Sequence, residues 1–291
     1  MGIREPVQIN AFDDNARMDT TDTRPPSALT IAGSDSGGGA GIQADLKTFA
    51  AHRVHGLSAI AALTAQHTRG VTAVHVPDTG FLRAQIDACF EDFSIAAVKL
   101  GMLANGDVIH AVADALERHR AAHVVLDPVM VATSGARLLE ASALDALRSR
   151  LLPLASVVTP NLPEAELLLG HPINDREAMQ HACTELLAAG ARAVLLKGGH
   201  LETGTDEDAE VVDLLAEGGD LHRIGHPRLQ LDAHGTGCTL ASAVAANLAL
   251  GSDLPAACGN GADYVHRALR GGYRPGRGNV IVLDHFGAAP A

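Results

Sequence analysis

In the last quarter of the chain, the turn His234-Gly235-Thr236-Gly237-Cys238-Thr239 is followed directly by an apolar helical pattern over residues 240–250. Such a turn points backbone N–H groups outward from the start of a helix, and with the helix dipole these groups form an anion site. A phosphoryl group in transfer is an anion of this kind. A tight turn whose glycines only relieve strain would explain a lone GxG about equally well.

Cys238 is the reactive side chain of this turn. A thiol at a helix N-terminus has a lowered pKa, so the sequence predicts a nucleophile or a base at this position. The alternative is a small buried residue. His234 could pair with Cys238 as in a thiol hydrolase, but we expect the turn between them to aim the two side chains apart.

A second glycine-rich segment, residues 33–45, follows the short apolar run 28–32. Ligands of open parallel sheets bind beyond the carboxyl ends of strands, so the segment lies where a site is expected. It is not a GxxxxGK[ST] phosphate loop, because no lysine follows the glycines at that spacing, and it does not match GxGxxG either. Asp45 falls in the first turns of the next predicted helix, where an acidic residue favours the dipole. A flexible entry loop is the alternative for the segment.

Polar side chains follow several other predicted strands. Asp127 comes after one strand, and Asn161 and Glu164 come after the next. Their oxygens suit Mg²⁺ beside phosphates, although Asn161 and Glu164 would equally form a helix cap with a reciprocal acidic partner. Lys197 ends a further strand and could neutralise phosphate charge; its alternative is a solvated lysine beside a turn. Gln66 could offer a paired donor and acceptor to the edge of a heterocycle.

Alternating strands and helices must position these residues. Alternation of this kind implies parallel strands joined by crossover helices, with a sheet that is buried on both faces. The predicted strands are 28–32, 54–62, 96–100, 124–126, 156–159 and 193–197, with an antiparallel edge at 211–215 and 221–224. The predicted helices are 41–51, 79–90, 106–118, 142–151, 175–189, 237–250 and 253–270.

Composition limits the classes of function. The chain has 291 residues, 47% of them hydrophobic, which is enough for one large α/β domain. A net charge of −12 without any Lys/Arg cluster argues against nucleic acid, and no apolar run is long enough to span a membrane. We therefore expect small-molecule partners and a cytoplasmic location. Residues 1–27 show no periodicity and are interpreted as a disordered leader before a single domain at 28–286.

Six segments occur in one order across the chain: GSDSGGGAGIQADLKTF, KLGML, VVLDPVMVATSG, TPNLPEAELLLG, LLKGGH and HGTGCTLASA. Their joint order closely resembles the hydroxymethylpyrimidine/phosphomethylpyrimidine kinases of thiamine biosynthesis, members of the ribokinase-like superfamily. The resemblance implies a three-layer α/β sandwich with a mainly parallel central sheet flanked by helices. It also implies ATP and Mg²⁺ as cofactors, a homodimer, and phosphorylation of 4-amino-5-hydroxymethyl-2-methylpyrimidine and then of its monophosphate.

The same resemblance assigns roles to individual residues. It implies that Gly33, Asp45, Gln66 and Met102 bind the pyrimidine, that Asp127, Asn161 and Lys197 serve the nucleotide, and that Asp127 and Glu164 serve the metal. Cys238 would be the general base where most ribokinase-like enzymes carry Asp. Independently of the base, the amides of Gly235, Thr236, Gly237 and Cys238 would stabilise developing charge.

The chain departs from the family pattern at a few positions. Gly37 stands where Ser is frequent, Thr133 where Lys is frequent, and Asp232-Ala233 where Asn-Thr is common. The loss of a lysine at Thr133 bears on nucleotide affinity and leaves the reaction class unaffected.

Three other functions fit parts of the pattern. Pyridoxal kinases share the superfamily and phosphorylate a similar hydroxymethyl group on a nitrogen ring. A thiol hydrolase would use Cys238 and His234 without ATP. A non-catalytic ligand-binding regulator would keep the fold and lack turnover.

Overall fold

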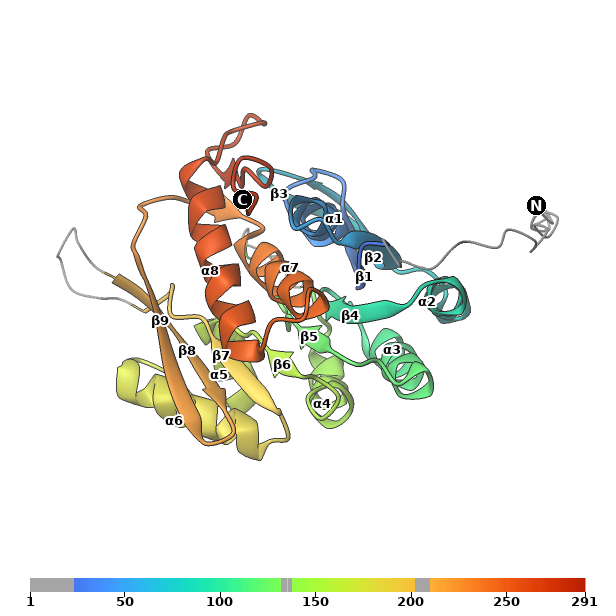
Figure 1. Cartoon of the computed structure of the whole chain (residues 1–291), viewed down its shortest axis with the longest axis horizontal. Helices are drawn as coiled ribbons and strands as arrows, with labels where there is room; N and C mark the ends of the chain where they lie inside the picture. Colours follow the sequence, from blue (N-terminus) through green and yellow to red (C-terminus); the bar gives the residue numbers. More distant parts are fainter. Residues whose placement is uncertain (1–23, 132–134, 136–137, 202–209, 291) are drawn as a thin grey trace.

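The computed structural model describes residues 24–131, 135, 138–201 and 210–290 (Figure 1). Most of the predicted leader, residues 1–23, lies outside the described residues, and the first strand begins at Ser27. Thr133 and most of the loop at 133–137 also lie outside them.

One nine-stranded sheet runs through the chain in the order β3-β2-β1-β4-β5-β6-β7-β8-β9. From β2 to β7 each neighbouring pair is parallel, whereas β3, β8 and β9 pair antiparallel. The strands are β1 (Ser27–Asp35), β2 (His55–His67), β3 (Gly70–His75), β4 (Ile95–Leu100), β5 (Val124–Leu126), β6 (Val157–Val158), β7 (Ala193–Leu196), β8 (Glu210–Glu217) and β9 (Asp220–Pro227). The predicted parallel sheet and its antiparallel edge are therefore confirmed.

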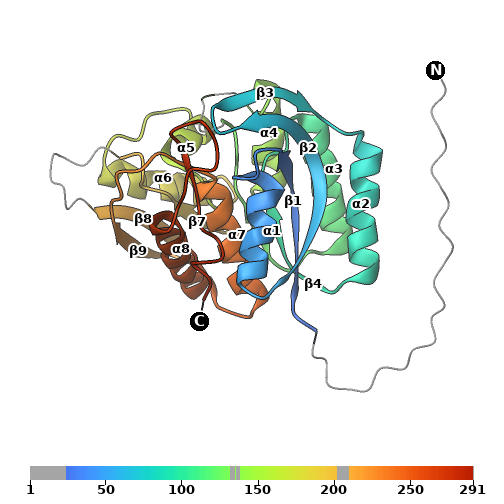
Figure 2. The same ribbon diagram turned by 90° about the horizontal axis from the view of Figure 1, so that it is seen from above.

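Helices cover both faces of this sheet (Figure 1). One layer consists of α1 (Gly41–Ala51), α7 (Thr236–Ala249) and α8 (Leu254–Arg270). The other consists of α2 (Thr79–Asp92), α3 (Gly106–His119), α4 (Leu144–Ala146) between short 3₁₀ and π turns, α5 (Leu162–Leu169) and α6 (Arg176–Ala188). Figure 2 shows α1 and α8 on the near side of the sheet and α3 on the far side. In the described part of the chain, no helix is both long and apolar enough to cross a bilayer.

The strands are continuous apolar runs because successive side chains enter opposite layers. Val125 of β5 and Leu195 of β7 pack with α7 and α8, whereas Leu126 and Leu196 pack in the cluster on the other face. All four side chains are fully buried. Successive residues of one apolar strand therefore contribute to the two hydrophobic cores in turn, one on each face of the sheet.

Three features differ from the predicted elements. The strand β1 does not stop at Gly33 but continues to Asp35 after a register shift, and β2 continues to His67, so Gln66 lies within a strand. The two extensions pair with each other beyond the point where β4 ends. This pairing keeps their backbone extended although several of their side chains are polar. The edge strand β3 and the helix α5 were not predicted, because β3 is largely exposed and α5 is short. A short pair, β10 (Ala233–His234) with β11 (Ile281–Val282), was also not predicted.

A buried ion pair joins four of these elements. Lys99 Nζ of β4 lies 2.9 and 3.0 Å from the two carboxylate oxygens of Asp45 in α1. Asp45 also accepts hydrogen bonds from Thr30 of β1 at 2.6 Å and Ser242 of α7 at 2.7 Å. All four residues are fully buried. Burial opposes the charge of Lys99, but Asp45 outweighs it and raises the pKa of the ammonium.

Removal of one partner of this ion pair should be costly. We expect Lys99→Met to lower the free energy of unfolding by about 3–5 kcal/mol, because the Asp45 carboxylate then stays buried without a cation. Urea denaturation of the two proteins measures the difference. The double variant Lys99→Met/Asp45→Asn should recover much of the loss, since no charge remains. A single variant within about 1 kcal/mol of the unmodified protein would contradict this account.

Candidate active site

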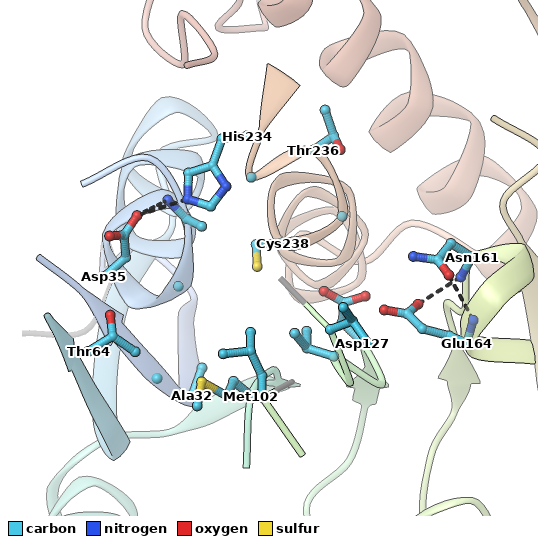
Figure 3. A pocket seen from close by; sticks show the side chains of 18 of the residues that line it. Ala32, Asp35, Thr64, Met102, Asp127, Asn161, Glu164, His234, Thr236 and Cys238 are labelled. Atoms are coloured by element: carbon cyan, nitrogen blue, oxygen red, sulfur yellow. Dashed lines mark hydrogen bonds and ion pairs between the residues drawn. The ribbon is translucent and has the colours of Figure 1, made fainter. Parts of the chain in front are cut away.

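A cavity of about 410 Å³ opens beyond the carboxyl ends of the parallel strands (Figure 3). Each strand end contributes to its lining, and α7 begins at its wall. Of the residues predicted for a site, the cavity is lined by Gly33, Gln66, Met102, Asp127, Asn161, Glu164, Lys197, Gly235, Thr236, Gly237 and Cys238. The structure thus brings together residues from seven separate segments of the sequence.

The start of α7 faces this cavity. Gly235 precedes the helix with φ of 87°, in the left-handed region that favours glycine, and no side chain of the described residues caps the helix. By contrast, α3, α5 and α6 begin with an Asn or Asp side chain that accepts a backbone N–H. The first N–H groups of α7 are therefore not taken by a cap and lie beside the cavity, which suits an anion.

Gly237 lets these amides approach two charged side chains. A Cβ at this position would lie 3.1 Å from Lys197 Nζ and 3.6 Å from both carboxylate oxygens of Asp127. Any side chain there would fill the space between the helix tip and the charged groups. The close approach, rather than the backbone angle, is what favours glycine at this position, because an added Cβ would press on the end of the Lys197 side chain.

The predicted lowering of the Cys238 pKa is wrong. Burial raises the pKa of the thiol to about 12, although Lys99 and a hydrogen bond from the Gly41 N–H act in the opposite direction. The carboxylates of Asp127 and Asp45 raise it further. Desolvation and these two anions therefore outweigh Lys99 and the Gly41 N–H, and a pKa of about 12 leaves Cys238 as a neutral thiol at neutral pH.

His234 does not pair with Cys238. Its Nε2 lies 3.2 Å from Asp35 Oδ2 and 2.9 Å from Gln66 Nε2. Figure 3 shows the His234 ring turned toward Asp35 and the Cys238 sulfur pointing away from this ring. The expected separation of the two side chains is confirmed, and the arrangement does not support a thiol hydrolase.

Lys197 stands between two acidic side chains. Its Nζ lies 3.1 Å from Asp127 Oδ1 and 3.8 Å from Glu164 Oε2. Burial disfavours the ammonium, but Asp127 and Glu164 outweigh it and raise the pKa of Lys197. Burial also raises the pKa of Glu164 to about 7, against the opposing effect of Lys197. One cation therefore does not fully compensate two buried carboxylates.

The helix-cap interpretation of Asn161 and Glu164 is confirmed. Asn161 Oδ1 accepts the Glu164 N–H at 2.9 Å, and Glu164 Oε2 accepts the Asn161 N–H at 2.8 Å, which is a complete capping box for α5. Both residues also line the cavity. The cap fixes the Glu164 carboxylate while its other oxygen makes no capping bond.

The donor set fits Mg²⁺ held together with phosphates. Within the described residues, no group of three or more His, Cys, Asp or Glu side chains could hold a metal by itself. Asp127 and Glu164 nevertheless line the same cavity, and burial first and the Asp127 carboxylate second raise the pKa of Glu164, so a cation beside the two carboxylates would favour their ionised forms. Mg²⁺ is commonly bound by one or two carboxylates, phosphate oxygens and waters.

The opposite end of the cavity combines an amide with apolar surface. Gln66 lies on β2, and its Oε1 is 3.0 Å from Thr64 Oγ1. Met102 follows β4 and is almost fully buried, and a Cβ on Gly33 would lie 3.0 Å from Met102 Sδ. This end therefore offers hydrogen bonds along one edge and a sulfur-containing apolar wall beside it.

The structure does not place Asp45 in the cavity. Asp45 is fully buried in its ion pair with Lys99. Its carboxylate is therefore not placed to contact a pyrimidine in the cavity, although the family resemblance had implied such a contact. Lys99, which sequence reasoning missed, lines the cavity instead. Its signal was a single lysine inside the apolar strand Ile95–Leu100, which in a buried strand requires an acidic partner.

A second cavity of about 320 Å³ adjoins the first. Both are lined by Asn161, Lys197, His200, Thr236 and Gly237, and the second extends between the strands β8 and β9 and the helices α7 and α8. Sequence reasoning did not identify it, because its walls come from segments without a recognisable motif. The two cavities meet at the tip of α7.

The phosphomethylpyrimidine kinase family model matches residues 35–283. A hydroxymethylpyrimidine/phosphomethylpyrimidine kinase of Rhizobium meliloti is 49% identical over 265 residues, which cover 89% of this chain and 96% of that protein. A thiamine biosynthesis bifunctional protein of Geobacter sulfurreducens is 49% identical over 264 residues, 90% of this chain. The chain spans about half the length of that bifunctional relative, 53%.

Solved structures of two kinds are also similar. A pyridoxal kinase from Staphylococcus aureus in complex with AMP-PCP and pyridoxal superposes with a TM-score of 0.82 at 32% identity, covering 90% of this chain and 94% of that chain. A phosphomethylpyrimidine kinase from Clostridium difficile gives a TM-score of 0.73 at 41% identity, covering 84% and 99%. These likenesses confirm the predicted ribokinase-like fold.

The neutral state of Cys238 can be tested by alkylation. We expect iodoacetamide at neutral pH to modify Cys238 about a thousandfold more slowly than free cysteine, because a pKa near 12 leaves that much less thiolate. Peptide mass mapping follows the reaction, and Cys238→Ser confirms the assignment. Cys238 lines the cavity, so reagent can reach it. A rate within about tenfold of free cysteine would show that the thiol is activated instead.

Proposed function

The chain belongs to the phosphomethylpyrimidine kinase family, and from this premise we propose that it phosphorylates 4-amino-5-hydroxymethyl-2-methylpyrimidine with ATP and then phosphorylates the monophosphate to the diphosphate. Such a diphosphate serves thiamine diphosphate biosynthesis, which agrees with the name of the Geobacter sulfurreducens relative. The observation that carries the proposal is the uncapped start of α7, which lies beside Lys197 where two cavities meet.

The two cavities divide the substrates between them. We propose that the second cavity holds the nucleoside part of ATP, and that its terminal phosphate reaches the tip of α7 beside Lys197. Residues Asn161 and Lys197, which line both cavities, would then lie along the phosphates. Asp127 and Glu164 would hold Mg²⁺, whose chemistry here is the neutralisation of phosphate charge.

The alcohol occupies the first cavity in this proposal. Gln66 would pair with the edge of the ring, and Met102 and Gly33 would lie against its surface. The hydroxymethyl group would then point toward Cys238 and the helix tip. A base role for Cys238 requires the neutral thiol to lose its proton in the complex. Positioning and the α7 amides are therefore expected to supply most of the catalysis.

Several further properties are part of the proposal and rest on the family and on composition. We propose that the enzyme is a cytoplasmic homodimer and that residues 28–286 act as one kinase domain, preceded by residues 1–27 as a leader. A second candidate function is phosphorylation of pyridoxal, because the Staphylococcus aureus pyridoxal kinase superposes over 90% of the chain.

ATP consumption against a panel of ring alcohols tests the function. We expect ADP formation with the hydroxymethylpyrimidine, and product masses that correspond to one and then two added phosphoryl groups. The kcat/KM for this alcohol should exceed that for pyridoxal. A higher value for pyridoxal would favour the second candidate. Absence of ADP with saturating pyrimidine would indicate a ligand-binding protein instead.

The role of the helix tip can be tested with two glycines. We expect Gly237→Ala to lower kcat by about 100-fold, because a Cβ there displaces the phosphate from the amides and from Lys197. Gly259→Ala is the matched control, since Gly259 lies in α8 with nothing within 4 Å of an added Cβ. Both changes favour helix and should not lower the thermal midpoint. Equal activity of the two variants would exclude the helix tip from catalysis.

A further inference from the structure

Four side chains from three distant segments form a row along the pyrimidine end of the first cavity. His234 Nε2 lies 3.2 Å from Asp35 Oδ2 and 2.9 Å from Gln66 Nε2. At the other end of the Gln66 amide, Oε1 lies 3.0 Å from Thr64 Oγ1. All four residues line the cavity. The row therefore consists of a carboxylate, an imidazole, an amide and a hydroxyl in sequence.

Asp35 can only accept hydrogen bonds in this row. Its carboxylate accepts the backbone N–H groups of Gly37, Gly39 and Ala40 at 2.7, 3.0 and 2.9 Å. Burial would raise its pKa, but hydrogen bonds from His234 and from these amides hold the pKa of Asp35 below its usual value. An ionised carboxylate has no proton to donate. His234 Nε2 must therefore carry the proton between them, which holds for both the neutral Nε2–H tautomer and the imidazolium.

This proton determines which end of the Gln66 amide can face His234. An amide is nearly symmetric in shape, so its orientation follows from the hydrogen bonds that its neighbours can make. Two N–H groups that face each other at 2.9 Å form no hydrogen bond. With the amide turned by half a turn about its terminal bond, the Gln66 carbonyl oxygen accepts from His234 Nε2–H.

Thr64 leads to the same orientation from the other side. Its hydroxyl has one proton, and Oγ1 lies 3.0 Å both from the Ser34 carbonyl oxygen and from the far end of the Gln66 amide. The Ser34 carbonyl can only accept, so it takes the hydroxyl proton. Thr64 Oγ1 is then an acceptor for the Gln66 NH₂ group. In this arrangement the single Nε2–H of His234 is shared between Asp35 Oδ2 and the Gln66 oxygen, and the Gln66 NH₂ group donates to Thr64 Oγ1.

We infer that Asp35 and His234 are positioning residues that orient the Gln66 amide, with its oxygen toward His234 and its nitrogen toward Thr64. One lone pair and one N–H of Gln66 then remain for a ligand. An aminopyrimidine presents an amino group beside a ring nitrogen. The amino group can donate to the Gln66 oxygen while the ring nitrogen accepts the Gln66 N–H, and this pairing is possible in one orientation of the ring only. The orientation of the ring fixes where its hydroxymethyl group lies. The inference rests on the proposed function for this choice of ligand.

The backbone fixes the imidazole in place. His234 lies on β10, where it pairs with Val282 of β11. A Cβ on Gly39 would lie 2.8 Å from His234 Cδ2 and 2.8 Å from Val282 Cγ1, so the ring packs closely against this glycine. The ring is thus held from two sides and can transmit the orientation set by Asp35.

A double-mutant cycle on kcat/KM for the pyrimidine alcohol tests the inference. We expect His234→Leu to lower this value by about 10- to 100-fold while the KM for ATP stays within about twofold. In a Gln66→Ala background the same change should cost less than about twofold, because no amide is left to orient. An equal loss in both backgrounds would mean that His234 acts only on the local structure, and would overturn the inference.

Two further measurements do not depend on the leucine variant folding well. His234→Gln keeps a side-chain N–H donor, and we expect it to recover most of the activity lost in His234→Leu. The ¹⁵N spectrum of the imidazole, assigned by its loss in His234→Gln, should show a protonated Nε2. An unprotonated Nε2 would overturn the inference. If the unmodified protein did not phosphorylate the alcohol, the proposed function would fail, whereas the spectrum would still decide the orientation.

Discussion

The geometry of the site depends on one fully buried carboxylate. The Asp45 carboxylate accepts hydrogen bonds from the Lys99 ammonium and from the hydroxyl groups of Thr30 and Ser242. Each of these residues belongs to a different element. A buried charge tolerates little displacement from its partners, because water cannot replace a lost hydrogen bond. The ion pair therefore fixes α1 and α7 against β1 and β4, and with them the start of α7 at the wall of the cavity.

Charges of both signs lie in the lining of the cavity or directly behind it. Lys99 is paired with Asp45, and Lys197 is shared by Asp127 and Glu164, while the thiol of Cys238 stays neutral between these groups. In the proposed function the site binds a highly charged nucleotide together with a divalent cation, and neither charge may stay buried without a partner. The shared lysine and the protonatable Glu164 give the free protein a way to balance its charge.

The fold and most of the lining residues could be predicted because parallel strands deliver their carboxyl ends to one edge. Asp127, Asn161 and Lys197 each follow a short apolar run, so order along the chain implied proximity in space. Asp45 could not be placed this way, because an acidic residue near the start of a helix looks solvated until its partner is known. The pKa of Cys238 was also out of reach, since it depends on burial and on carboxylates from other segments.

The pairing of β10 with β11 gives the site a particular history during synthesis. Gly39 and Gln66 are made early, whereas the strand that holds His234 against them ends at Val282, close to the carboxyl terminus. Contacts between such distant segments form late and slow the folding of a chain. Until residues up to Val282 have been synthesised, a nascent polypeptide can thus have its central sheet without the contact that holds His234 in the pocket.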